Sequence, residues 1–135
     1  MRIRTTAQGE IELAASVEEF KALRARVRDI VVGAAEAVSV AAEMGYDPSP
    51  YDAILARLVI ERIDQPVCAA IAGDALRIAG SSKGLDAFCS DLAFDDAAVP
   101  GCHSHYEHYD GHPFISPDSM PLVIAVGYVQ AAPPN

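Results

Sequence analysis

An internal repeat constrains the fold of this chain more than any other feature of its sequence. Shifting the sequence by 65 residues places residues 8–28 over residues 73–93, and apolar residues, a serine and a turn dipeptide then coincide. The matched pairs are Ile11 with Leu76, Leu13 with Ile78, Ser16 with Ser81, Phe20 with Leu85, Leu23 with Phe88, and Val27 with Leu92. The repeat predicts a single domain, residues 1–135, built from two diverged units, residues 1–65 and 66–130.

Each unit begins with two short segments of alternating apolar and polar residues around a tight turn. The turn dipeptides are Gln8-Gly9 in the first unit and Gly73-Asp74 in the second. Alternation of this kind predicts strands, and the short connection predicts that they pair as an antiparallel hairpin. The predicted strands are residues 2–6, 10–14, 67–72 and 75–79.

One amphipathic helix is predicted after each hairpin. Ser16 and Glu19 have the spacing of a capping box, in which each side chain accepts a hydrogen bond from the backbone amide of the other residue. Ser81 stands at the same place in the second unit. Apolar residues then recur at helical spacing in both units. They are Phe20, Leu23 and Val27, and then Leu85, Phe88 and Leu92.

Two further strand-like segments follow each helix. They are residues 34–42 and 55–63 in the first unit, and 102–109 and 122–128 in the second. Alanine also favours helix, so the sequence leaves residues 30–44 open between helix and strand. The predicted fold class is α+β: two β-β-α-β-β units of mainly antiparallel sheet, with one helix per unit packed on it. Whether the units share one sheet or form two is also open.

The chain is acidic, and its charge is unevenly distributed. Its net charge is −9, and residues 66–135 contain 2 basic and 8 acidic side chains, against 8 and 11 in residues 1–65. Nucleic acid is bound where lysine and arginine cluster, so we expect no nucleic-acid partner for this half. An anionic surface attracts a basic protein partner, although such a charge also serves solubility.

The cysteines and the apolar runs indicate neither export nor a membrane. Cys68, Cys89 and Cys102 form no C-x-x-C pair, which is typical of reduced thiols in the cytoplasm. No apolar run approaches the roughly 20 residues that span a bilayer, and no secretory segment is recognisable. We therefore expect a cytoplasmic protein without a membrane partner.

All four histidines lie within residues 103–112, which makes this segment the main candidate for a site. Side chains alternate between the two faces of a strand. On a strand here, His103, His105 and Glu107 would therefore share one face. The opposite face would carry Cys102, Ser104, Tyr106 and His108.

The repeat predicts a further property of this strand. At the same shift, Ser104 lies over Ser39, and the two histidines at 103 and 105 lie over Val38 and Val40. A face that is apolar in the first unit would therefore carry imidazoles in the second.

The residues alone leave open whether this segment has a structural role or a chemical one. The histidines could be half-buried and hydrogen-bonded to the backbone or to Glu107. Alternatively, His103, His105 and Glu107 could be zinc ligands, although the spacing matches no zinc signature and a fourth ligand would be needed. Ser104 or Cys102 could be a nucleophile whose base comes from another segment.

A recognition surface is the remaining interpretation of the segment. Tyr106 and Tyr109 would present aromatic rings beside the imidazoles and carboxylates. Aromatic anchors of this kind dominate the energetics of protein interfaces.

Four short motifs of the second unit carry a family resemblance. They are Leu76-Arg-Ile-Ala-Gly80, an amphipathic helix over residues 85–92, Gly101-x-His103-x-His105, and Ser119-x-x-Leu122-Val-Ile124. Together they resemble the Immunity protein 32 family, over residues 66–128. The resemblance implies a protein that binds and neutralises a toxin of a bacterial polymorphic toxin system in the cytoplasm, without catalysis. It makes Gly101, His103, His105 and Ser119 candidate binding residues, to which the strand geometry adds Glu107.

The function predicted from these observations is that of a small acidic immunity protein, with a basic cognate toxin as partner and no cofactor or enzyme activity. One alternative is a zinc-binding protein or zinc-dependent enzyme that uses the histidine cluster. A second is a homodimeric structural module, in which the apolar segment Leu122–Val126 pairs across a two-fold axis.

Overall fold

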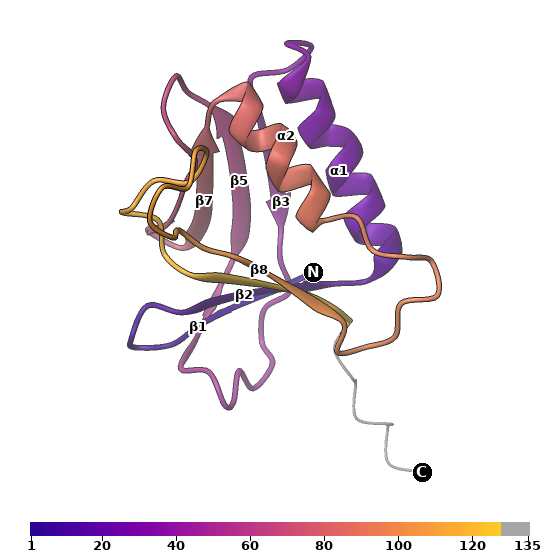
Figure 1. The fold of residues 1–135 in the computed structure, drawn as a ribbon. Helices are drawn as coiled ribbons and strands as arrows, with labels where there is room; N and C mark the ends of the chain where they lie inside the picture. The colour runs from indigo at the N-terminus through magenta and orange to yellow at the C-terminus, as the bar shows by residue number, and fades with distance from the viewer. Residues whose placement is uncertain (128–135) are drawn as a thin grey trace.

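The repeat produces the hairpins and helices that the sequence predicts (Figure 1). The structure, a computed structural model, describes residues 1–127. The first unit begins with β1 (Arg2–Thr5), β2 (Ile11–Ala15) and α1 (Val17–Val31). The second begins with β6 (Cys68–Ala72), β7 (Ala75–Gly80) and α2 (Ser82–Asp91).

The two serines explain where the helices begin. Ser16 Oγ accepts a hydrogen bond from Glu19 N at 3.1 Å, and Glu19 Oε1 accepts one from Ser16 N at 3.1 Å. Ser81 Oγ likewise accepts from Gly84 N at 3.1 Å. These bonds satisfy amides that have no acceptor within the helix. The predicted capping box is therefore confirmed.

Loss of the first cap should destabilise the protein measurably. We expect Ser16→Ala to lower the free energy of unfolding by about 1 kcal/mol, because the backbone amide of Glu19 loses the side-chain oxygen that accepts its hydrogen bond. Chemical denaturation measures this loss. The control is Ser90→Ala, at an exposed position of α2, with an expected change within about 0.5 kcal/mol. An equal effect at both serines would contradict the capping role of Ser16.

The segment after α1 is a strand, β3 (Ala37–Ala41), which decides the question left open for this alanine-rich stretch. The segment predicted as one strand at 55–63 is divided into β4 (Ala53–Leu55) and β5 (Arg57–Arg62). The reason is that β4 pairs with β1, whereas β5 pairs with β3 and β7. The chain therefore passes from one sheet to the other at Ala56.

The second unit ends with β8 (His103–Tyr106) and β9 (Leu122–Val126). Both lie within the segments predicted as strands. Tyr128, the predicted end of the last strand, lies outside the described residues.

The two units exchange strands to form two sheets. The five-stranded sheet has the order β4-β1-β2-β9-β8, and the four-stranded sheet has the order β3-β5-β7-β6. The units are joined by two parallel pairs, β2 with β9 and β5 with β7, while the other pairs are antiparallel. Each sheet thus combines a hairpin of one unit with the last strands of the other, and the fold class is α+β, as predicted.

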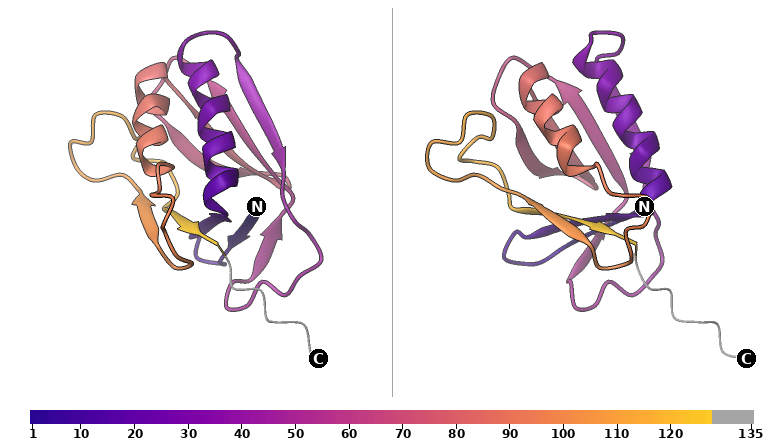
Figure 2. Two further views of the ribbon diagram at one scale, coloured as in Figure 1. Left: turned by 90° about the vertical axis from the view of Figure 1, so that its right-hand side faces the viewer. Right: turned by 45° about the vertical axis from the view of Figure 1, so that its right-hand side comes forward.

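The hydrophobic core lies between the two helices and the two sheets. Both helices cover one face of the four-stranded sheet, and the five-stranded sheet crosses below them (Figures 1 and 2). Phe20 and Phe88 are fully buried helix residues of this core. Within residues 1–127 there is no helix with the length and apolarity that a bilayer crossing requires.

The structural repeat differs from the sequence repeat in the strands that follow the helices. In one sheet, Ile60 of β5 pairs with Ile78 of β7. In the other sheet, Ile124 of β9 pairs with Leu13 of β2. Leu13 and Ile78 are matched by the repeat, so their partners should be matched as well. Ile124 is therefore the structural counterpart of Ile60, one residue away from the position that the 65-residue shift predicts.

In β8, the strand that carries His103 and His105, the structural match with the first unit is displaced by one residue in the opposite direction. Val38 pairs with Ile60 and Ser104 pairs with Ile124, so Ser104 corresponds to Val38 rather than to Ser39. A slip of one residue exchanges the two faces of a strand. The predicted alignment of the histidines with Val38 and Val40 is therefore wrong.

His103 and His105 correspond instead to Ala37 and Ser39 of β3, and all four residues are exposed. The imidazoles have not replaced core residues. They stand on a face that is open to solvent in both units.

Candidate binding surface around strand β8

Strand β8 forms an edge of the five-stranded sheet and carries two candidate residues on its outer face. The ring centroids of His103 and His105 are 5.1 Å apart, and both side chains are exposed. Tyr106 faces the core, where its ring packs edge-on against Phe88 at 5.1 Å. The alternation predicted for these three residues is present.

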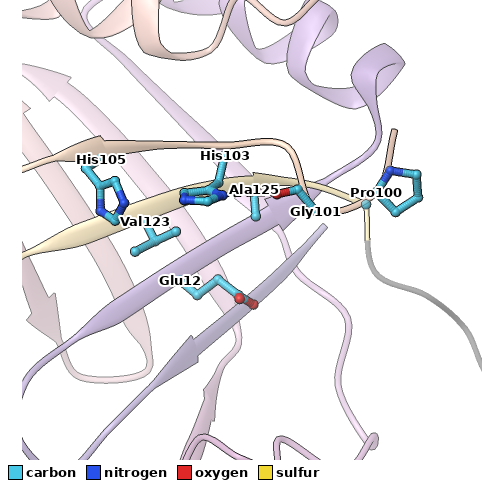
Figure 3. Close-up of a pocket in the computed structure, with 8 residues that line it drawn as sticks. Glu12, Pro100, Gly101, His103, His105, Val123 and Ala125 are labelled. Atoms are coloured by element: carbon cyan, nitrogen blue, oxygen red, sulfur yellow. Dashed lines mark hydrogen bonds between the residues drawn. The ribbon is translucent and has the colours of Figure 1, made fainter. Parts of the chain in front are cut away.

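A groove of about 480 Å³ lies on the outer face beside the histidines. Val123 and Ala125 of β9 lie between the histidines and Glu12 of β2 (Figure 3). The groove therefore has an apolar centre, with imidazoles along one side and a carboxylate along the other.

A smaller hollow of about 260 Å³ shares His105 and Val123 with this groove. Its other lining residues include Glu10, Tyr51 and Glu107. The outer face thus offers a continuous surface along β8 and β9, with a second and a third carboxylate beside it.

The arginines of this sheet are already engaged. Arg4 Nε donates to Glu12 Oε1 at 2.8 Å, and the guanidinium lies 4.3 Å from the ring centroid of Tyr51. Arg2 lies 4.2 Å from the ring centroid of Tyr46. The loop that carries these tyrosines therefore covers the β1 side of the outer face and leaves the β8 side open.

An inner cleft of about 430 Å³ lies on the opposite side of β8, between the end of α2 and the loop after β8. Tyr109 and His112 line it, with ring centroids 4.5 Å apart. Asp91, His105 and Glu107 also line it. The cleft therefore combines aromatic rings with carboxylates, a lining suited to cations.

The carboxylate of Asp91 lies in an unfavourable electrostatic environment within this cleft. Asp91 is half-buried and is the last residue of α2, where the negative end of the helix dipole disfavours a carboxylate. Within residues 1–127, its carboxylate has no hydrogen bond and no ion pair. Burial raises its pKa, which positive charge on His112 would lower.

Tyr106 shares this environment. Its hydroxyl is buried, and no hydrogen-bond partner for it is found among the described residues. Burial, and then the nearby Asp91 carboxylate, raise the pKa of this hydroxyl. The Tyr106 hydroxyl is therefore a buried polar group without a partner among the described residues, and such a group reduces stability.

The raised pKa of Asp91 predicts a measurable effect of pH on stability. The folded state favours the protonated carboxyl of Asp91. The protein therefore loses stability as pH rises from the ordinary pKa of an aspartate toward the higher pKa that Asp91 has in the folded state. We expect Asp91→Asn to increase the free energy of unfolding at pH 7 more than at pH 3. Denaturation of both proteins at the two pH values measures this difference.

Asp47 is a control of opposite sign for this prediction. Its carboxylate accepts a hydrogen bond from Ser49 N at 2.9 Å, which lowers its pKa. Asp47→Asn should therefore cost more stability at pH 7 than at pH 3. An Asp91→Asn variant that is less stable than the natural protein at pH 7 would contradict the account of Asp91.

The three hollows meet at His105 and share one electrostatic character. Their lining residues include the carboxylates Glu10, Glu12, Asp91 and Glu107, and include no lysine or arginine. Among these four, Glu12 is in an ion pair, with Arg4. The surface around β8 is therefore acidic, with apolar and aromatic contact area between the charges.

The structure brings together four of the five residues predicted to bind. Gly101, His103 and His105 line the outer groove, and Glu107 lines the smaller hollow and the inner cleft. Ser119 lies apart from them, because its Oγ accepts a hydrogen bond from Ala69 N at 2.9 Å at the β6 edge. The contact found for Ser119 is thus structural.

The other two histidines stabilise the loop after β8. His108 Nδ1 lies 2.8 Å from the carbonyl oxygen of Ile115, and His112 Nδ1 accepts from the amides of Phe114 and Ile115 at 3.0 and 3.1 Å. The hydrogen-bonded interpretation therefore describes His108 and His112. His103 also has a backbone contact, from Nδ1 to the carbonyl oxygen of Gly101 at 3.0 Å, but its side chain and that of His105 are exposed.

The structure gives no support to the zinc and nucleophile alternatives. No group of three histidine, cysteine, aspartate or glutamate side chains that could hold a metal ion is found among residues 1–127. The hydroxyl of Ser104 donates its hydrogen bond to the backbone carbonyl oxygen of Asp91 at 3.0 Å, on the inner side of the strand, and not to a side chain that could act as a base.

The homodimer alternative relied on an unpaired Leu122–Val126 strand. This strand, β9, pairs with β2 on one side and with β8 on the other. It has no free edge, so a second copy cannot pair with it.

Sequence reasoning missed the residues that face the histidines from other elements. They are Glu10, Glu12, Tyr51 and Asp91. Asp91 carries one signal that sequence could supply, since it is an acidic residue at the C-terminal end of a predicted helix, where basic residues are favoured. Comparison with protein-family models, with curated proteins and with solved structures finds no match.

Proposed function

We propose that this protein binds a basic protein partner through the surface around β8, and that the partner is a toxin which it neutralises. The observation that carries the proposal is the shared lining of the three hollows. The lining includes carboxylates and no lysine or arginine, and the Asp91 carboxylate has no hydrogen bond or ion pair within residues 1–127. A lysine or arginine of the partner would supply the missing charge.

The nature of the surface favours a protein over a small molecule. The hollows are open and are spread over both sides of one strand, with exposed His103, His105 and Tyr109 between them. Aromatic and imidazole rings around apolar residues are typical of the central part of a protein interface.

The immunity role rests on the resemblance of the second unit to the Immunity protein 32 family. Three residues of that resemblance, Gly101, His103 and His105, lie together at the outer groove. An acidic protein that covers basic residues of a toxin would neutralise it by occlusion, and this mode of action requires no catalytic group.

The two exposed histidines provide a test of this surface. We expect the double variant His103→Ala, His105→Ala to weaken binding of a protein partner, isolated with the chain from its own cells, by about 2 kcal/mol, as for residues at the centre of an interface. Calorimetry measures the affinity, and circular dichroism checks that the fold is unchanged.

Ser39→Ala on β3 is the matched control, because Ser39 is the structural counterpart of His105 on the other sheet. It should bind like the natural protein. An unchanged affinity of the double variant would exclude the histidine face as the interface.

A further inference from the structure

We propose that the partner adds an extended basic segment to the free edge of β8, as one further strand of the five-stranded sheet. This inference rests on the proposed function and specifies how the partner binds. It follows from the direction of the backbone groups of β8, from the state of the other sheet edges, and from the charges on both sides of the strand.

The hydrogen-bond pattern fixes which backbone groups of β8 point outward. Val126 N donates to the carbonyl oxygen of Cys102 at 2.7 Å, so Cys102 faces β9. Backbone groups alternate in direction along a strand. Ser104 and Tyr106 therefore face β9 as well, and the N–H and C=O groups of His103 and His105 point away from the sheet.

No strand of the described chain pairs with this outward side, because β8 is the last strand of its sheet. The outward groups of the two histidines can therefore form up to four backbone hydrogen bonds with an added strand. An unpaired edge of this kind is a template for another chain.

The edge at β6 is covered by the chain itself. Val67 N donates to Phe114 O at 2.7 Å, Ser116 N donates to Val67 O at 2.8 Å, and Met120 N donates to Ala69 O at 2.8 Å. The segment at 114–120 thus occupies the position that an added strand would take there.

The two remaining edges are poorer templates. Strand β4 has three residues, Ala53–Leu55. Strand β3 presents the exposed side chains of Ala37, Ser39 and Ala41, which offer neither charge nor ring. Strand β8 presents two imidazoles and lies between the outer groove and the inner cleft.

The charges around β8 specify the occupant. Asp91 lies on the inner side of the strand, next to Ser104, and Glu107 follows its last residue. Alternate side chains of an added strand project to the two sides of the sheet, so lysine or arginine on the inner side would enter the cleft. A second copy of this chain is disfavoured as the occupant, because each copy carries a net charge of −9.

Three synthetic peptides of eight alternating lysine and valine residues test this inference. The first is unmodified, the second carries N-methyl groups on two alternate residues, and the third carries them on two adjacent residues. Alternate methylation leaves one edge of the peptide able to form hydrogen bonds, whereas adjacent methylation blocks both edges. All three peptides have the same charge, and the two methylated peptides have the same number of methyl groups.

Binding is measured by titration of the backbone amide signals of His103 and His105 in nuclear magnetic resonance spectra. We expect the unmodified and alternately methylated peptides to bind with similar affinity, and the adjacently methylated peptide to bind at least about tenfold more weakly. Equal binding of both methylated peptides would overturn strand addition and leave the basic-partner proposal standing. Absence of binding by all three would overturn both.

A pair of protein variants tests the same inference from the other side. His105→Pro removes the outward N–H, at a position where an edge strand tolerates proline, while His105→Ala retains it. We expect the proline variant to bind the unmodified peptide about tenfold more weakly than the alanine variant. Equal affinities of the two variants, with both folded, would contradict the proposal.

Discussion

Exchange of Asp91 and Glu107 together for lysine should weaken partner binding by at least about 100-fold, the largest effect on binding that we expect from this surface. Both carboxylates line the inner cleft, so the exchange places two positive charges where the partner's basic side chains would lie. The fold should survive, because a lysine at the C-terminal end of α2 is favoured by the helix dipole. Calorimetry with the purified partner measures the loss.

Glu36→Lys with Asp64→Lys is the matched control. Both residues are exposed and lie at the four-stranded sheet, and their exchange changes the net charge by the same amount. If the control weakened binding as much as the cleft variant, long-range attraction alone would explain the affinity and the cleft would not be the site.

Gly80→Ala is expected to be the most destabilising small substitution, with a loss of about 3 kcal/mol or more. A methyl group at Gly80 would lie 2.6 Å from the backbone Cα of Val67, a distance that forces the end of β7 away from the segment before β6. Thermal and chemical denaturation measure the loss. A stability within about 1 kcal/mol of the natural protein would show that this packing is wrong.

Gly84→Ala, one turn into α2, is the matched comparison. Its methyl group would meet the side chain of Val67, with Cγ2 at 2.5 Å, and no Val67 backbone atom is among its near contacts. Shortening that side chain by Val67→Ala should therefore remove most of the cost of Gly84→Ala, and alanine then favours helix over glycine by about 1 kcal/mol. The same change should not rescue Gly80→Ala, because the Cα of Val67 remains in place.

The local elements of the fold could be predicted because they depend on neighbouring residues. Ser16 and Glu19 specify a cap within one turn, and a tight-turn dipeptide specifies a hairpin between two adjacent segments. The exchange of strands between units could not be predicted in this way. The pairing of β2 with β9 joins residues more than 100 positions apart, and the apolar patterns of the strands are compatible with several partners.

The face of the histidines shows how a small error in register changes the interpretation. The alternation of His103, Ser104 and His105 was predictable from the period of a strand. Their alignment with the first unit was not, because the repeat slips by one residue in opposite directions at β8 and β9. A slip of one residue exchanges core and solvent faces, and sequence similarity alone does not reveal it.

Asp91 and Glu12 joined the candidate site through tertiary contacts alone. Asp91 lies at the end of α2 and reaches β8 through the packing of that helix beside the strand, whereas Glu12 on β2 comes near β8 only after β9 has paired with both strands. The sequence could indicate that Asp91 is unfavourable at the end of a helix. It could not indicate that this carboxylate would be half-buried without a partner.

The central claim is that this protein binds a basic protein through the surface around β8. Native mass spectrometry of the protein, purified gently from its own cells, tests this claim most directly, since one spectrum reports partner, metal and self-association together. We predict a stoichiometric complex with a basic polypeptide, which the variant with lysine at positions 91 and 107 does not retain. A bare chain carrying one zinc ion, or a complex that this variant retains unchanged, would contradict the claim.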